Sequence, residues 1–175
     1  MGIPRIALTL LVVSALVITP CLAQRYHPSL ANPKGPELTA VYISSTWCIG
    51  NRAPGLHEAI DSLKLMLQRR AQAAGRQFRM IGVAIDWSPD SGLAYLKEFG
   101  EFDELVVGRN WFNIAAERFV WADTTAISGI PQLLVYEQTV TPGQRRVGFS
   151  ASHVVKRVGG GDKIVQWVRD GAPIP

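Results

Sequence analysis

Apolar residues along this chain form short continuous runs that alternate with segments of helical periodicity. The continuous runs are typical of buried strands, and they cover residues 38–44, 78–86 and 131–138. The periodic segments repeat apolar residues every three or four positions, which predicts helices over about 52–72, 90–102 and 113–120. Strands that alternate with helices favour a mainly parallel sheet with helices on both faces.

The remaining segments complete an α/β fold with a central mixed sheet. A short strand is predicted at 104–108, and the stretches "RRVGF" and "HVVKRV" are predicted to pair as antiparallel strands after the turn "TPGQ". Three glycines at 159–161 then break the chain. Asp162 is the predicted N-cap of a terminal helix over "KIVQWVRD".

The first 23 residues resemble an export signal. Arg5 precedes an apolar run of signal-peptide length, and Ala23 supplies a small residue at the expected cleavage site. Two alternatives stay open: an uncleaved membrane anchor, and a lipoprotein with its lipid on Cys21, because 18–21 loosely resembles a lipobox. Each version predicts a periplasmic or secreted domain. Membrane contact is expected only through a lipidated Cys21 or an uncleaved N-terminal segment.

The composition of the rest of the chain predicts three segments and excludes several classes of function. We expect a flexible linker at 24–37, one domain at 38–170 and a short tail at 171–175. The net charge is +4, but the basic residues are scattered, so no nucleic-acid surface is predicted. The three histidines, His27, His57 and His153, lack metal-ligand spacing. No metal and no cofactor are predicted.

Cysteine usage narrows the candidate chemistry to one residue. The chain has two cysteines, and Cys21 lies in the export segment. The exported domain therefore keeps a single thiol, Cys48, which excludes a disulfide scaffold and leaves a free thiol in an oxidising compartment. Cys48 stands where a predicted strand gives way to a helix. Unpaired backbone N–H groups at such a junction favour the thiolate, the nucleophilic form.

Two motifs together resemble the thioredoxin-like superfamily. "TWC" occupies the first strand–helix junction, and "SGIPQLLVY" leads into a strand some eighty residues later. The extra segment before "GIP" resembles the insertion of periplasmic TlpA-type thioredoxins. The resemblance implies a thioredoxin fold over about 38–170 and a cis peptide at Ile130-Pro131 facing Cys48. It also implies that Trp47 flanks the cysteine and docks substrate together with the Ile130-Pro131 backbone.

Two positions depart from the family pattern. Asn51 stands where the second cysteine of C-x-x-C would be, and Tyr42 replaces the acid that often precedes the first cysteine. Asn51 is expected either to cap the following helix or to donate a hydrogen bond to the sulfur. Arg52 is expected to add positive potential. With one thiol, only the first half of disulfide exchange is available, so the partners are protein or small-molecule thiols and disulfides.

Three functions therefore stay open. The favoured one is monothiol, oxidoreductase-like or isomerase-like exchange in which Cys48 forms mixed disulfides that an external thiol resolves. The second is a redox-silent thioredoxin-fold binding module, in which Cys48 is a small apolar residue. The third is a thiol peroxidase, because Ser45 occupies the place of a peroxiredoxin threonine, although Val41 stands at the matching proline position. Asp86 and Trp87 end the second strand and are expected to pack or to shape the pocket.

Overall fold

The computed structural model describes residues 24–123, 128–150 and 152–175. The predicted export segment and Cys21 lie outside the described residues. A sheet of six strands forms the centre of the molecule, and five of the strands follow the order β3-β2-β1-β4-β5, while β6 also pairs with β4. Their bounds are β1 Gly35–Ser44, β2 Gln77–Ala84, β3 Glu104–Val107, β4 Gln132–Pro142, β5 Val147–Phe149 and β6 His153–Gly159.

The sheet is mixed, as predicted. β1 runs parallel to β2, and β2 runs parallel to β3. β4 is antiparallel to β1, β5 and β6. The α/β fold class with a mixed sheet flanked by helices is confirmed, and it is the arrangement that the thioredoxin resemblance implies. The two stretches predicted as antiparallel strands after the turn do form such strands. β5 and β6 each pair with β4, which is long enough to hold one at each end.

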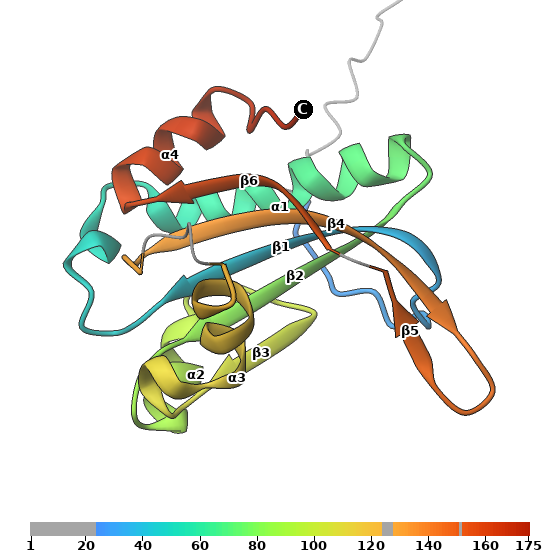
Figure 1. The fold of residues 1–175 in the computed structure, drawn as a ribbon. Helices are drawn as coiled ribbons and strands as arrows, with labels where there is room; N and C mark the ends of the chain where they lie inside the picture. The colour runs from blue at the N-terminus through green and yellow to red at the C-terminus, as the bar shows by residue number, and fades with distance from the viewer. Residues whose placement is uncertain (1–23, 124–127, 151) are drawn as a thin grey trace, which may run out of the picture.

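Helices cover both faces of the sheet (Figure 1). One apolar cluster joins the sheet residues Leu38, Ala40 and Tyr42 to helices α1, α2 and α4. The alternate residues Val41 and Ile43 belong to a second cluster with the segment that contains α3, because successive strand side chains point to opposite faces. The helical bounds are α1 Leu56–Ala73, α2 Pro89–Lys97, α3 Ile114–Ala116 and α4 Gly161–Arg169, with single turns η1 Ile49–Arg52, η2 Asn110–Phe112 and η3 Glu117–Trp121.

Two helix starts differ from the prediction. α1 begins at Leu56 rather than near position 52, since Gly55 precedes it with a φ of 81° and separates it from η1. α4 begins at Gly161 with Gly160 at the N-cap, so Asp162 lies inside the first turn instead of capping it. Ser88 caps α2, because its hydroxyl accepts a hydrogen bond from the Ser91 backbone N–H at 3.3 Å.

The segments predicted as linker and tail both pack on the domain. β1 already begins at Gly35, and the Tyr26 ring is buried with its edge on Phe78, at a centroid separation of 5.7 Å. At the other end, the Ala172 carbonyl accepts a hydrogen bond from Arg70 of α1 at 2.6 Å. These contacts extend the folded unit beyond the expected limits of 38–170. No helix within the described ranges is long and apolar enough to cross a bilayer.

Candidate active site

Cys48 lies at the end of the loop that follows β1. Its backbone is extended, with φ −74° and ψ 120°, and it caps the short turn η1 rather than the long helix α1. The Cys48 N–H donates to the Ser45 carbonyl at 3.3 Å. Only 9% of the residue is exposed, and it is the free cysteine of the described part of the chain. The loop therefore holds one largely covered thiol at the carboxyl end of a central strand.

The thiol faces the segment that leads into β4. The Ile130-Pro131 peptide is cis, the isomer that the resemblance implies. The Cys48 thiol donates a hydrogen bond to the Ile130 carbonyl, with the two heavy atoms 3.1 Å apart. Gly50 makes this approach available, because a Cβ at that position would lie 2.5 Å from Pro131 Cδ. Sequence positions more than eighty apart thus meet at the sulfur.

Asp86 fixes the first half of the Cys48 loop. Its carboxylate, at the end of β2, is only 4% exposed. It accepts hydrogen bonds from the Thr46 backbone N–H at 3.2 Å and from the Thr46 hydroxyl at 2.5 Å. Asp86 therefore does more than pack, since it ties the residues just before Cys48 to the neighbouring strand.

Asn51 fixes the second half of the loop, and neither expected role for it is correct. No side-chain capping bond forms at η1, and α1 has Gly55 at its N-cap. The Asn51 amide donates instead to the Ser45 carbonyl, while its oxygen accepts from the Ser44 hydroxyl at 2.5 Å and from Tyr42 at 3.5 Å. The Asn51 side chain therefore joins the end of the loop to β1 and to Ser45, the residue that follows the strand.

Tyrosines fill the region beneath Asn51. The hydroxyls of Tyr42 and Tyr95 are 2.9 Å apart and hydrogen-bonded to each other. Burial raises the pKa of Tyr95 to about 12, and burial together with the neighbouring Tyr95 raises the pKa of Tyr42 well above its usual value. Both phenols are therefore neutral at physiological pH. Tyr42 supplies a neutral hydrogen-bonding group where an acid often stands in the family that the sequence resembles.

The expected support for a thiolate is not visible around the sulfur. Cys48 is a hydrogen-bond donor toward a carbonyl oxygen, and none of the described residues donates a hydrogen bond to its sulfur. Arg52 is exposed and forms no hydrogen bond or ion pair within the described ranges. The Ser45 hydroxyl is buried without a partner in that part of the chain, so it does not bond the sulfur as the peroxidase alternative requires. Among the described residues, the sulfur therefore faces a hydrogen-bond acceptor and no hydrogen-bond donor.

Exposed apolar side chains lie in the loops near the thiol. Trp47 is 55% exposed and Ile49 is 78% exposed, on either side of Cys48 in sequence. Trp87 and Phe112 are also exposed, with ring centroids 6.3 Å apart. The Asp86 contacts described above bring the Trp87 loop next to the Trp47 loop. Sequence analysis identified Trp47 but missed Ile49 and Phe112, since apolar residues in the single turns η1 and η2 show no periodicity.

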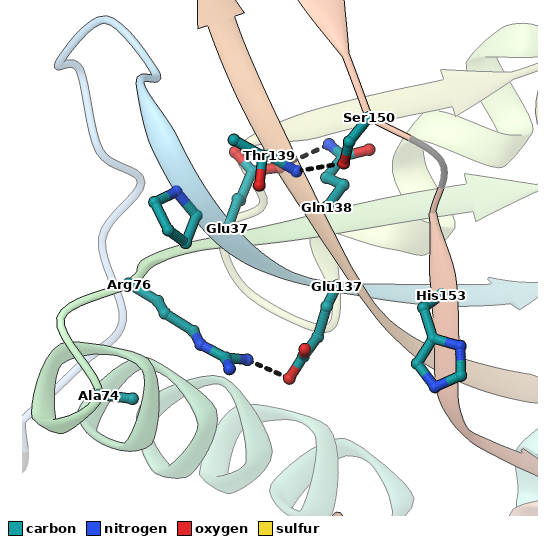
Figure 2. Close-up of a pocket in the computed structure, with 9 residues that line it drawn as sticks. Glu37, Ala74, Arg76, Glu137, Gln138, Thr139, Ser150 and His153 are labelled. Atoms are coloured by element: carbon teal, nitrogen blue, oxygen red, sulfur yellow. Dashed lines mark hydrogen bonds and ion pairs between the residues drawn. The ribbon is translucent and has the colours of Figure 1, made fainter.

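A separate cavity of about 360 Å³ lies near the opposite end of β1 (Figure 2). Arg76 and Glu137 form an ion pair there, and His153 lies across the strand pair from Glu137. The cavity is lined by Pro36, Glu37, Ala74, Arg76, Glu137, Gln138, Thr139, Ser150 and His153. It contains no cysteine. Within the described residues, no group of three or more His, Cys, Asp or Glu side chains is placed to hold a metal ion.

Comparisons with known proteins give only distant similarities. No protein-family model and no curated protein matches the chain. The chain is similar in structure to a thiol:disulfide interchange protein of the thioredoxin family from Chlorobium tepidum TLS, at 20% identity over 75% of this chain and 79% of that chain, with a TM-score of 0.36. It is also similar to yeast Sco1 with copper bound, at 14% identity over 84% and 94% of the two chains, with a TM-score of 0.38. Similarities at this level assign no chemistry to this chain.

Proposed function

We propose that this protein is an exported, thioredoxin-fold monothiol protein that forms mixed disulfides through Cys48. The observation that carries the proposal is the placement of Cys48. It is held at the carboxyl end of β1 against the Ile130 carbonyl, while the position three residues on is an asparagine bonded to Ser44 of β1. The likeness to periplasmic TlpA-type proteins and the export of the chain are part of this proposal.

The chemistry is one exchange step followed by external rescue. Cys48 gives up its proton, and its sulfur attacks one sulfur of a partner disulfide. A mixed disulfide forms, and the other partner sulfur leaves as a thiol. A second, external thiol then attacks the mixed disulfide, which restores Cys48 and produces a new disulfide. No electrons are gained or lost overall, so this cycle shuffles disulfides and does not reduce them.

Exposed groups beside the sulfur give a partner polypeptide something to bind. Trp47 and Ile49 present apolar surface on either side of Cys48. The Ile130 carbonyl, which accepts the thiol hydrogen bond at rest, becomes available for an extended backbone when the sulfur reacts. The proposed substrates are therefore protein segments that carry a thiol or disulfide, with small-molecule thiols as resolving partners.

A mass measurement tests the proposal directly. The full chain with Cys21→Ser is incubated with glutathione disulfide, so that Cys48 is its sole thiol. The expected product carries one glutathionyl group and loses it when reduced glutathione is added in excess. Cys48→Ser in the same background is expected to stay unmodified. A Cys48 chain that acquires no adduct, while it remains folded and its thiol is alkylated after denaturation, contradicts the proposal.

Asn51→Cys provides a matched variant. It restores the spacing of a dithiol, in which the second thiol displaces a partner bound to the first. We expect the glutathionyl adduct to be replaced by an internal disulfide between the two cysteines, with a mass two hydrogens below the reduced form. A stable glutathionyl adduct on this variant would show that position 51 does not decide whether the mixed disulfide persists.

A redox-silent binding module is the second candidate. It is favoured by the 9% exposure of Cys48 and by the absence of hydrogen-bond donors to its sulfur among the described residues. In that case Cys48→Ser leaves the capture of any partner unchanged, and glutathione disulfide gives no adduct on the folded chain. The mass measurement therefore separates the two candidates.

A further inference from the structure

The Ser45 carbonyl links Asn51 to the backbone of Cys48. It accepts a hydrogen bond from the Cys48 N–H at 3.3 Å and another from the Asn51 side-chain amide. Ser45 itself is fully buried. A single carbonyl oxygen thus holds both the start and the end of the turn that carries the sulfur, and a carbonyl has two lone pairs for these two donors.

The other side of the Asn51 side chain is bound to β1. Its oxygen accepts the Ser44 hydroxyl at 2.5 Å, and the fully buried Tyr42 lies on the same oxygen at 3.5 Å. The N–H group of the carboxamide therefore binds the loop, and its oxygen binds the strand. Only an amide of this length presents both groups at once, because a carboxylate lacks the donor and an alkyl side chain lacks both.

A second anchor, Asp86, holds the loop at a different residue. Asp86 holds Thr46 from the side of β2, two residues before the cysteine. Asn51 holds the loop from the side of β1, three residues after the cysteine. The sulfur lies between these anchors and meets the Ile130 carbonyl at 3.1 Å. Removing the Asn51 anchor leaves the Thr46 anchor in place, so we expect the loop to become more mobile but to keep its fold.

We propose that Asn51 is the positioning residue of Cys48: without touching the sulfur, its carboxamide holds the thiol on the Ile130 carbonyl and keeps it covered until a partner binds. This inference rests on the proposed exchange function of Cys48. Position 51, where a dithiol pair would have its second cysteine, then carries a residue that restrains the thiol of Cys48. A released thiol leaves the carbonyl, becomes accessible and reacts faster with small reagents.

Three variants separate the donor of Asn51 from its acceptor. Asn51→Ala removes both groups. Asn51→Asp keeps an acceptor for Ser44 and Tyr42 but turns an anionic oxygen toward the Ser45 carbonyl. Ser44→Ala removes one donor to Asn51 and leaves the link to Ser45 intact, so it is the matched control.

Two measurements on the full chain with Cys21→Ser report on the thiol itself. The first is the rate of Cys48 alkylation by iodoacetamide, and the second is the S–H stretching band in the Raman spectrum, which shifts to lower frequency when the thiol donates a hydrogen bond. For Asn51→Ala and Asn51→Asp we expect alkylation to accelerate by about fivefold, the factor equivalent to one ordinary hydrogen bond. The S–H band moves to the frequency of a free thiol. Ser44→Ala stays within about twofold of the parent chain.

The possible outcomes distinguish the positioning role of Asn51 from the proposed exchange function of Cys48. If Asn51→Ala retains the shifted S–H band and the parent alkylation rate while its melting temperature falls, Asn51 is only structural and the inference is wrong. If Asn51→Asp behaves as the parent chain does, the donor to Ser45 is unimportant and the inference is also wrong. Neither result affects whether Cys48 forms a glutathionyl adduct. A parent chain without the adduct contradicts the proposed function, while the S–H band still tests the restraint on the thiol.

Discussion

The two ends of β1 use buried polar groups in different ways. At the end of the strand, Ser44 and Tyr42 reach Asn51 through neutral hydrogen bonds and hold the loop that carries Cys48. At the start of the strand, Glu37 is a charged group that is only 3% exposed. It accepts hydrogen bonds from Thr39 and Gln138 at 2.8 Å each and pairs with Arg79 at 3.0 Å.

The start of β1 serves stability, whereas its end holds the loop of the proposed exchange chemistry. Glu37 joins three strands, since Thr39 lies on β1, Arg79 on β2 and Gln138 on β4. Every partner there belongs to the sheet. At the other end, the hydrogen bonds join the sheet to a loop. A change at the start of β1 should therefore alter the free energy of unfolding and spare the thiol, whereas a change in the hydrogen bonds of Asn51 at the other end should act chiefly on the thiol.

Glu37→Gln should give the largest effect on stability. The substitution leaves Arg79 facing an uncharged amide in a buried position, and removing one member of a buried pair costs several kcal/mol. Arg79 keeps Glu104 as a second partner at 3.3 Å, so we expect a loss of roughly 2–4 kcal/mol in the free energy of unfolding. Urea titration measures it.

Glu104→Gln is the matched control for this prediction. The Glu104 side chain is 49% exposed, and exposed pairs contribute little. We expect a change of less than about 1 kcal/mol. The alkylation rate of Cys48 should match that of the parent chain in both variants. An altered rate in Glu37→Gln would mean that the two ends of β1 are coupled, and the comparison would fail.

Tyr95→Phe should give a moderate effect that depends on pH. At neutral pH the variant should lose about 1 kcal/mol in the free energy of unfolding, because the buried Tyr42 hydroxyl loses the closer of its two partners. Burial raises the pKa of Tyr95 to about 12 in the folded chain. The unfolded chain releases this proton at a lower pH, so stability falls as the pH rises from about 10 toward about 12.

The variant should lose part of that alkaline decline. Urea midpoints measured at neutral pH and up to about pH 12 should therefore fall less steeply for Tyr95→Phe than for the parent chain. Parallel curves for the two proteins would show that the Tyr95 phenol does not remain protonated in the fold.

Trp47→Ala should give the smallest effect on stability. Trp47 is 55% exposed, so the free energy of unfolding should change by no more than about 0.5 kcal/mol. If Trp47 binds partner polypeptides, the adduct with a disulfide-containing peptide should form more slowly, while glutathione disulfide reacts at the parent rate. Equal slowing with both reagents would indicate a general change at the thiol instead of a lost binding contact.

The regular elements of the fold were predictable from sequence because each has its own local pattern. The strand predicted at 78–86 is β2, Gln77–Ala84, and the strand at 131–138 is the first part of β4. The start of α1 was missed because the left-handed backbone of Gly55 is a local turn within an otherwise helical pattern. The packing of Tyr26 was missed because it depends on Phe78, a residue distant in sequence.

The site was predictable in place but not in detail. Cys48 and Pro131 could be named because the family resemblance rests on those positions. The role of Asn51 could not, since its three oxygen partners lie six to nine residues earlier in the chain and meet it only where the loop folds back on β1. The anchor at Asp86 likewise depends on β1 and β2 lying side by side.

The proposed formation of mixed disulfides can be measured by mass spectrometry of Cys48 in protein recovered from the cells that make it, with free thiols blocked by an alkylating reagent at lysis. We expect a fraction of molecules in which Cys48 carries a disulfide-linked thiol or polypeptide that a reducing agent removes. The proposal would be contradicted if Cys48 were recovered from cells solely as the alkylated free thiol, and if the folded protein also formed no adduct after exposure to glutathione disulfide.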